Sequence, residues 1–445
     1  MKITVIFPSV KIFMSQTRNK EWATRWIQHG IALLIAYAKK NGLTVDLIDV
    51  RRLRNWDEYA KRVSEYDALC FSVNSIDYYV YLECLKRAKE VNPKATVIVG
   101  GIHPTIKLSD FIKDSRVDYI IQKEGEIAFV NLLKQISSGK KDIPRVQVGE
   151  PVELDSVPYI DRDLWEKEYP WGLDFSGKPP FVTILTSRAC LRNCFFCQPC
   201  ARLMFGNVER RRSIDNVIGE LRSLDEKYHF RSWMVHDDGF LQNLDWCKGF
   251  IRLFKEEFGS RPFIIQSRPD YPVRCKEIIP ELRSIGLEWA ILGFESGSDN
   301  VLKFLRKGTT RQMNLEAARN LRENGVKVFA NIMFGVPTET REDIDLTMSM
   351  VREMEPDHFS PATYSPYPGS YLHDYCKERN LILTEHSPRD LGEHKIKGID
   401  YEYIQKRVDE YRHSRAPIRY FLYNISPPPI RHFLYNIHRK VWAYR

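Results

Sequence analysis

The segment FVTILTSRACLRNCFFC, residues 181–197, is the most informative stretch of this 445-residue chain. Its first five residues are apolar or β-branched and predict a short buried strand. Cys190, Cys194 and Cys197 follow directly, on what we expect to be a loop after that strand. Three thiolates at this spacing on one loop can hold three irons of a four-iron cluster, which leaves the fourth iron open to a chelating substrate.

A zinc knuckle is the alternative use of these cysteines. Zinc normally takes a fourth protein ligand, and Cys200, with Pro199 before it, could supply one. The strand that precedes the loop and the motifs further along the chain favour the cluster, so we expect Cys200 to be a packing or near-cluster thiol. Nine cysteines and a first segment, MKITVIFPSV, without a signal-peptide cleavage pattern predict a cytoplasmic, reducing location.

From residue 181 onward, short apolar runs alternate with amphipathic stretches. Six such β/α units predict an incomplete parallel barrel of the TIM type, whose active site lies at the carboxyl ends of its strands. The expected strands are residues 181–185, 232–237, 263–267, 288–293, 326–334 and 359–364.

Short motifs follow several of these strands: HDDGF (236–240), LGFESGS (292–298), GVPTET (335–340) and YPGS (367–370). A glycine-rich turn taken alone is a weak signal, because it more often permits a backbone geometry than binds a ligand. Asp237 could orient a ribose or a substrate, or it could cap the following helix. Arg268, after the third strand, could contact a carboxylate of a ligand or pair with a neighbouring acid.

The first 125 residues contain five further strand patterns, at residues 3–7, 44–49, 68–73, 96–99 and 119–122, with helical patterns between them. This order predicts a doubly wound, Rossmann-like parallel sheet. Such sheets bind ligands beyond the carboxyl ends of their strands, where the sequence places residues 8–10, 72–75, 100–104 and 124–126. A charged stretch without sustained periodicity, residues 137–180, predicts a connector.

The CxxxCxxC spacing, with the aromatic Phe196 before the last cysteine, resembles the radical S-adenosylmethionine (SAM) superfamily. The resemblance implies a [4Fe-4S] cluster on Cys190, Cys194 and Cys197, with SAM chelating the fourth iron. It also implies that one electron from the cluster cleaves SAM and gives a 5′-deoxyadenosyl radical. It also implies an external electron donor of the flavodoxin or ferredoxin type. By the same resemblance the SAM-binding residues are Phe196, Asp237, Arg268, Glu295, Ser296 and Gly335.

The motifs GGIHP (100–104) and EGE (124–126) are similar to the cobalamin-binding domains that are fused to one subgroup of this superfamily. An ordinary flavodoxin-like sheet with glycine turns is the alternative. Many cobalamin domains carry DxHxxG after the first strand, but the loop PSVK (8–11) holds no histidine. The lower face of cobalt is therefore open, water-bound or covered by another side chain. The implied cobalamin-binding residues are Ser72, Asn74, Gly100, Gly101, Ile102, His103, Pro104, Glu124, Gly125 and Glu126.

These features predict four parts: a cobalamin-binding domain (1–136), the connector (137–180), a radical SAM domain (181–385) and a C-terminal extension (386–445). The resemblance implies a cobalamin-dependent radical SAM methyltransferase that acts on an unactivated carbon of a small-molecule substrate, for which a lipid or a secondary metabolite would fit. One alternative is cobalamin radical chemistry without net methyl transfer, such as cyclisation, oxidation or rearrangement. A corrinoid carrier or sensor is an alternative of another class.

The last 35 residues are basic and carry a repeat. The formal net charge of the chain is +9, and residues 411–445 hold seven Lys/Arg and no Asp or Glu. PIRYFLYNI (417–425) is followed by PIRHFLYNI (429–437). Aromatic anchors between arginines fit a segment that lies on an anionic membrane surface, at the inner membrane face. Packing on the barrel, across its open seam, is the alternative, and no nucleic-acid partner is expected because no such module is present.

Overall fold

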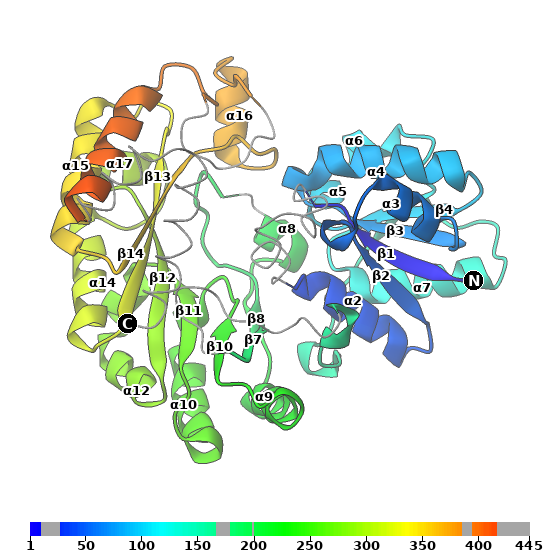
Figure 1. Ribbon diagram of the computed structural model, residues 1–445, viewed down its shortest axis with the longest axis horizontal. Coiled ribbons are helices and arrows are strands. Elements are labelled where there is room, and N and C mark those ends of the chain that lie inside the picture. Colours follow the sequence, from blue (N-terminus) through cyan, green and yellow to red (C-terminus); the bar gives the residue numbers. More distant parts are fainter. Residues whose placement is uncertain (10–26, 166–178, 198–199, 385–393, 416–445) are drawn as a thin grey trace.

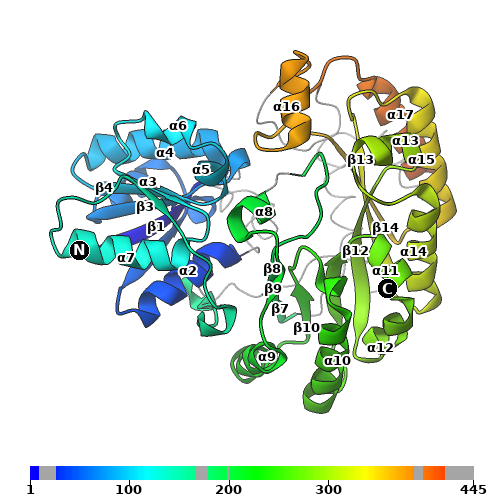
Figure 2. The same cartoon turned by 180° about the vertical axis from the view of Figure 1, so that it is seen from behind.

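The computed structural model describes residues 1–9, 27–165, 179–197, 200–384 and 394–415. These residues form two α/β domains that lie side by side, with the short helix α8 (Cys200–Phe205) between them (Figures 1 and 2). The N-terminal domain is built on one parallel sheet, and the C-terminal domain on a second. The predicted fold class, a Rossmann-like domain followed by a partial barrel, is confirmed.

The N-terminal sheet has the strand order β2-β1-β3-β4-β5-β6, and all of its pairings are parallel. The chain moves outward from β1 first to one side and then to the other, so the order reverses next to β1, as in doubly wound sheets. The strands are β1 (Ile3–Phe7), β2 (Val45–Asp49), β3 (Ala68–Ser72), β4 (Thr96–Gly100), β5 (Tyr119–Gln122) and β6 (Val146–Val148). The helices are α2 (His29–Lys40), α3 (Trp56–Val63), α4 (Tyr78–Val91), α5 (Ile102–Ile106), α6 (Ser109–Ile112) and α7 (Gly125–Ser137).

Strand β6 belongs to the stretch that the sequence predicts to be a connector. It is a three-residue edge strand, Val-Gln-Val, with half-buried or exposed residues, and it is too short to show a sustained alternation. Gly149 follows it and donates its N–H to the Gln122 carbonyl at 2.9 Å. A Cβ on Gly149 would lie 1.6 Å from the Glu124 carbonyl oxygen. Only glycine therefore lets the connector cross the end of β5 so closely.

The second sheet has the order β14-β13-β12-β11-β10-β7 and is fully parallel. The edge strands β7 and β14 do not pair with each other among the described residues, so the barrel is partial, as expected. The strands are β7 (Phe181–Ile184), β10 (Ser232–Val235), β11 (Phe263–Ser267), β12 (Leu287–Glu295), β13 (Lys327–Phe334) and β14 (His358–Thr363). The helices of this domain are α9 (Ile214–Tyr228), α10 (Leu244–Phe258), α11 (Asp270–Arg274), α12 (Ile279–Ser284), α13 (Asp299–Phe304), α14 (Arg311–Glu323), α15 (Arg341–Met354), α16 (Tyr371–Glu378) and α17 (Tyr401–Arg415).

Burial alternates along the central barrel strands. On β13, Val328, Ala330, Ile332 and Phe334 are buried, and they belong to the large core under the helices. The residues between them, 327, 329, 331 and 333, are half-buried and face the other way. The inner surface of the barrel is therefore apolar in part but reachable by solvent.

Polar side chains cap the first turn of six described helices of this domain. Each capping side chain accepts a hydrogen bond from a backbone N–H of the first turn, which satisfies a donor that the helix itself leaves unpaired. The caps are Ser213 of α9, Asn243 of α10, Ser298 of α13, Thr310 of α14, Thr340 of α15 and Ser370 of α16.

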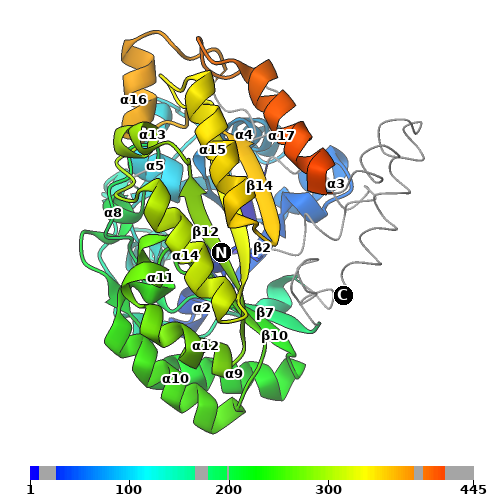
Figure 3. The same cartoon turned by 90° about the vertical axis from the view of Figure 1, so that its left-hand side faces the viewer.

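The C-terminal extension begins as helix α17, which packs on the outside of the barrel against α15 (Figure 3). Tyr411 of α17 is buried and its ring lies 5.0 Å from that of Phe359. The repeated aromatic blocks lie outside the described residues. Among the helices that the structure describes, none is long and apolar enough to cross a bilayer.

Candidate functional site

The cysteine loop leaves the carboxyl end of β7 and precedes α8, as expected from the sequence. Cys194 is buried, Cys190 is half-buried and Cys197 is exposed. All eight cysteines whose side chains are described are free thiols. Burial raises the pKa of the Cys190 thiol, so this side chain is protonated until a metal displaces the proton.

Phe195, between the second and third cysteines, anchors the loop to the barrel. Its N–H donates to the Leu305 carbonyl at 2.8 Å, and its own carbonyl accepts from the Leu372 N–H at 2.9 Å. Its ring contacts those of Phe304 and Tyr375. The loop is thus fixed to α13 and α16 through a residue that lies one position before the predicted Phe196.

Gln242 forms hydrogen bonds with the backbone on both sides of Cys190. Its Oε1 accepts from the Leu191 N–H at 3.2 Å and its Nε2 donates to the Ala189 carbonyl at 3.3 Å. Ala189 has φ 83°, a left-handed conformation that costs energy for a residue other than glycine. The Gln242 contacts on both flanks help to offset this cost, and sequence analysis did not identify this residue.

Arg268 lies beside the buried cysteine. Its Nη1 donates to Cys194 Sγ at 3.1 Å and its Nε to Asp270 Oδ1 at 2.9 Å. Asp270 also accepts from Arg192 Nη2 at 2.5 Å. Although burial opposes it, the facing Cys194 and Asp270 raise the pKa of Arg268. Arg268 therefore contacts the buried cysteine and pairs with an acid at the same time.

The donor set fits an iron–sulfur cluster. Among the described side chains, no three His, Cys, Asp or Glu gather closely enough to hold a metal ion. In a four-iron cluster each cysteine binds a different iron. The three thiols therefore need to lie on one loop but do not need to converge on a single metal ion. The three free thiols on this anchored loop, one of which accepts a hydrogen bond from the Arg268 guanidinium, meet that requirement.

Glu295 and Gly335 lie at the barrel mouth. Glu295 ends β12 at a break in the register with β13, has φ 65°, and accepts from Lys307 Nζ at 2.9 Å. Gly335, with φ 74°, donates its N–H to Glu339 Oε2 at 2.6 Å. A positive φ at a glutamate marks a strained position, and such positions gather at functional sites. Ser296, by contrast, is fully buried and its Oγ lies 3.0 Å from Thr347 Oγ1, so its hydroxyl points into the protein.

The structure gives Asp237 a role that neither sequence interpretation anticipates. Its buried carboxylate accepts from the backbone N–H groups of Thr186 and Ser187, at 2.7 and 3.2 Å, and from both hydroxyls. It therefore neither caps the following helix nor faces the barrel mouth with free oxygens. It ties the end of β10 to the segment that leads from β7 into the cysteine loop.

The predicted cobalamin loops meet at the carboxyl edge of the N-terminal sheet. Gly101 has φ 104°, and a Cβ there would lie 3.0 Å from both N and O of Val73, so the turn before α5 requires glycine. Asn74 donates to Asp77 Oδ2 at 3.0 Å. The remaining predicted positions at this edge are half-buried, for Ser72, Gly100, Ile102 and Gly125, or buried, for Pro104.

His103 is a buried structural residue. Its Nδ1 lies 3.0 Å from Ser75 Oγ and its Nε2 3.2 Å from Asp110 Oδ2, and its ring packs against Tyr78 and Phe111. Both ring nitrogens are thus engaged within the domain. Contact of His103 with cobalamin stays a prediction.

Glu124 and Glu126 bind the other domain. Both are buried, and their carboxylates accept from Arg188 at 2.6 and 2.5 Å. Arg210 also pairs with Glu124. Arg188 and Arg210 lie opposite each other in a two-stranded antiparallel ribbon, β8 (Ser187–Arg188) and β9 (Arg210–Arg211), that brackets the cysteine loop and α8. The side chains of Glu124 and Glu126 therefore form a clasp between the domains, and contact of the EGE motif with cobalamin stays a prediction.

Two further contacts join the same regions. Helix α8, which follows the cysteine loop, packs against α5, which follows the GG turn (Figure 2). A Cβ on Gly369, in the YPGS motif, would lie 2.1 Å from Ile106 Cγ2. The cluster loop and the glycine-lined edge are therefore brought together from opposite domains.

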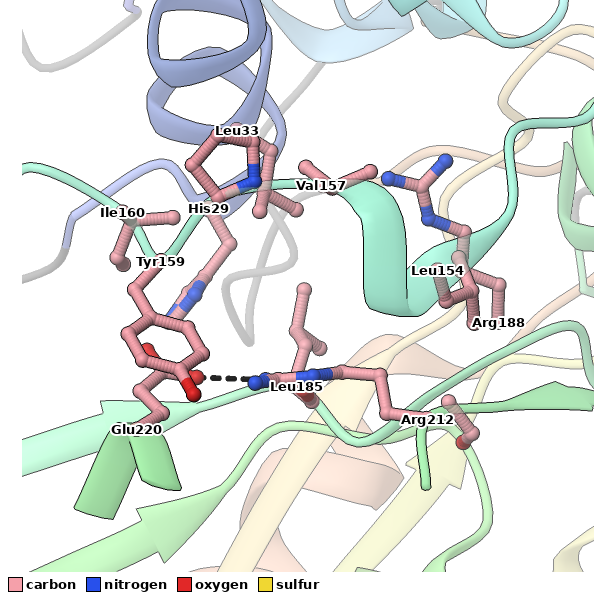
Figure 4. Close-up of a pocket in the computed structure, with 12 residues that line it drawn as sticks. His29, Leu33, Leu154, Val157, Tyr159, Ile160, Leu185, Arg188, Arg212 and Glu220 are labelled. Atoms are coloured by element: carbon pink, nitrogen blue, oxygen red, sulfur yellow. Dashed lines mark hydrogen bonds and ion pairs between the residues drawn. The ribbon is translucent and has the colours of Figure 1, made fainter. Parts of the chain in front are cut away.

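A cavity of about 30 Å³ opens at the domain junction, beneath the clasp. In Figure 4, His29 and Tyr159 approach the ion pair of Arg212 with Glu220 from the side of α2 and the connector. The residues that line the cavity are His29, Leu33, Leu154, Val157, Pro158, Tyr159, Ile160, Leu185, Ser187, Arg188, Arg212 and Glu220.

Comparison with known proteins gives two matches to families: the Radical SAM superfamily over residues 184–351 and the B12 binding domain over residues 19–133. An uncharacterized methyltransferase of Pyrococcus horikoshii is 26% identical over 361 residues, 77% of this chain and 75% of that protein. An anaerobic magnesium-protoporphyrin IX monomethyl ester cyclase of Rubrivivax gelatinosus is 27% identical over 396 residues, 84% and 69%. The structure of the radical SAM methyltransferase TsrM of Kitasatospora setae, with cobalamin and a [4Fe-4S] cluster bound, matches with a TM-score of 0.65 at 15% identity, over 85% of this chain and 75% of that one, and this likeness concerns the fold alone.

Proposed function

The chain belongs to the cobalamin-dependent radical SAM enzymes, and from that premise we propose that it transfers a methyl group to an unactivated carbon of a small-molecule substrate. Its cofactors are a [4Fe-4S] cluster, SAM and cobalamin. The observation that carries the proposal is the clasp of Glu124 and Glu126 with Arg188 and Arg210, because it fixes the two cofactor domains against each other. The methyltransferase of P. horikoshii, similar over three quarters of both chains, supports the same reaction.

Within this proposal, Cys190, Cys194 and Cys197 hold the cluster. Arg268 supports Cys194 through its hydrogen bond to Sγ. Phe196, half-buried with Lys307 Nζ 5.6 Å from its ring centre, would border SAM. When bound, the reduced cluster supplies an electron to SAM, and cobalamin supplies a methyl group.

The SAM site would take its polar contacts from Glu295 and Gly335 at the barrel mouth. Glu295 already binds Lys307, so this carboxylate is oriented before a ligand arrives. Cobalamin would lie along the backbone of the GG turn, where Gly100 and Gly101 permit a close approach, with Ser72 and Asn74 at the neighbouring loop. Our proposed domain boundaries remain residues 1–136, 137–180, 181–385 and 386–445, with strand β6 of the connector completing the N-terminal sheet.

The test is incorporation of label. Reconstituted enzyme is incubated with candidate substrates and SAM that carries a deuterated methyl group, and products are analysed by mass spectrometry. A product that gains one methyl group with three deuterium atoms supports methyl transfer. A product that lacks label while 5′-deoxyadenosine accumulates with substrate would contradict it.

Cyclisation without net methyl transfer is the second candidate, and the cyclase of R. gelatinosus favours it because that relative aligns with 84% of this chain. The label experiment separates the two reactions. We further propose an external flavodoxin- or ferredoxin-type electron donor, and peripheral contact of residues 411–445 with an anionic membrane on the cytoplasmic side.

A further inference from the structure

The inner surface of the barrel has an apolar layer with a polar layer above it. Phe181, Met234, Ile264 and Trp289, from four neighbouring strands, form one inward cluster. Residues two positions apart on a strand share a face, so the next inward positions toward the carboxyl ends are polar on three of these strands. They are Thr183, His236 and Gln266.

A histidine of the other domain joins this polar layer. His29 is the first residue of α2, and its Nε2 lies 2.8 Å from Thr183 Oγ1. Its ring centre is 5.6 Å from that of His236, whose Nδ1 lies 3.4 Å from Gln266 Nε2. The N-terminal domain thus places one imidazole beside another at the open side of the barrel, next to β7.

Both imidazoles are uncharged near neutral pH. Burial lowers the pKa of His236 to about 4, and burial followed by the charges of His236, Arg162 and Arg212 lowers the pKa of His29. A neutral imidazole offers one donor and one acceptor nitrogen. The pair can therefore bind a polar group by hydrogen bonds without carrying a charge of its own.

Arg162 and Arg212 place positive charge near His29. Arg162 and Arg212 both bind the buried Glu220, at 3.2 and 2.5 Å, so two guanidinium groups face one carboxylate. A cation placed beside His29 would be repelled in this poorly solvated site, whereas an anion or a neutral acceptor would be stabilised. The apolar inner surface continues on β12 and β13 with the half-buried Ile291, Phe329 and Met333.

We propose that His29 and His236 receive the polar, non-cationic end of the substrate, most simply a carboxylate, while its apolar part lies on the inner surface of β12 and β13. This inference rests on the proposed function in one respect, that the substrate lies inside the barrel. It adds a specificity-determining residue from the N-terminal domain, so that the substrate site is complete only when the two domains are docked.

Equilibrium dialysis of two probes tests the pair. The full chain, loaded with cluster, cobalamin and SAM, is dialysed against [14C]benzoate or [14C]benzylamine, which share a ring and differ in charge. We expect benzoate to bind the unchanged protein about tenfold more tightly than benzylamine. Thr183→Val removes one hydroxyl without changing shape, and His29→Leu removes the imidazole; each should weaken benzoate binding by roughly three- to tenfold, as expected for one lost hydrogen bond.

Two matched variants complete the design. His29→Gln keeps a donor near the position of Nε2 and should restore most of the affinity that His29→Leu loses. His229→Asn alters an exposed histidine at the end of α9, where asparagine tolerates the left-handed backbone, and should leave benzoate binding unchanged.

Equal binding of the two probes, or undiminished benzoate binding by both His29→Leu and Thr183→Val, would overturn the inference. Cleavage of SAM to 5′-deoxyadenosine, with dithionite as the one-electron reductant and without added substrate, is measured on the same samples. Its absence from the unchanged protein would contradict the proposed function and leave the dialysis result standing, so the two failures are distinguishable. Should His29→Leu fold poorly, Thr183→Val alone decides.

Discussion

Single residues other than the cysteines determine the geometry of the cluster loop. Gln242 bridges the backbone on both sides of Cys190. Gln242→Leu keeps the side-chain volume but removes both hydrogen bonds, which together stabilise the left-handed Ala189 by about 1–3 kcal/mol. We expect the variant to hold fewer than about half of the irons of the unchanged protein after anaerobic reconstitution. Gln312→Leu, at an exposed position of α14, is the control, and equal iron content in the two variants would contradict this role for Gln242.

The cysteine triad gives the second prediction at this scale. Cys190→Ala, Cys194→Ala and Cys197→Ala combined should abolish both bound iron and SAM cleavage, because no other described side chains gather to hold a metal. Cys200→Ala should retain about four irons per chain. Iron analysis and chromatography of 5′-deoxyadenosine provide the measurements, and loss of iron in Cys200→Ala would favour the zinc alternative.

Glu339 predicts a pH dependence of stability. Burial, and then the charge of Asp343, raises its pKa to about 8 from a usual value near 4.5. The folded chain therefore binds a proton here more tightly than the unfolded chain, and this contribution to stability is lost as the pH rises from about 4.5 through 8. Glu339→Gln removes the titration, so unfolding free energies should diverge in favour of the variant by a few kcal/mol between pH 6 and 8.5. Parallel pH profiles from chemical denaturation would refute the assignment.

Local spacing explains which site residues the sequence could reveal. The three cysteines lie within eight positions, and Gly101 sits in a dipeptide after a strand, so each is visible in one window. Gln242 and Asp270 act on the loop from 45 or more positions away. The sequence singles out Asp237, Glu124 and Glu126 but not their partners. A carboxylate in a sequence does not indicate whether it binds a ligand or another part of the protein.

At the scale of elements, the ribbon β8–β9 and helix α8 connect the domains. Glu124→Gln keeps the size of the side chain but leaves Arg188 and Arg210 with less compensating charge in a buried place. Removing one member of such a buried group costs about 3 kcal/mol or more. We expect faster proteolysis between the domains and weaker retention of cobalamin on gel filtration.

Glu150→Gln is the control, because it removes a negative charge at an exposed position of the connector, residues 137–180. Unchanged proteolysis in Glu124→Gln would mean that α8 and the Ile106 contact hold the domains without the clasp. The strands were predicted to within a few residues where they are apolar and four or more residues long. The strands that were missed, β6, β8 and β9, have two or three residues, too few to show a period.

At the scale of the whole molecule, the basic tail predicts binding to an anionic membrane. Helix α17 packs on α15 and buries Tyr411, so a chain that ends at Arg415 keeps this helix and loses only residues 416–445 with five Lys/Arg. Each basic residue near an anionic bilayer contributes roughly 1 kcal/mol, and interfacial aromatic burial adds to it. The full chain should co-sediment with phosphatidylserine vesicles, less so at high salt and poorly with phosphatidylcholine, while the shortened chain stays in solution with its iron and cobalamin. A shortened chain that loses its cofactors instead would show that the tail packs on the barrel and closes its seam, because an independent membrane anchor can be removed without disturbing a distant metal site.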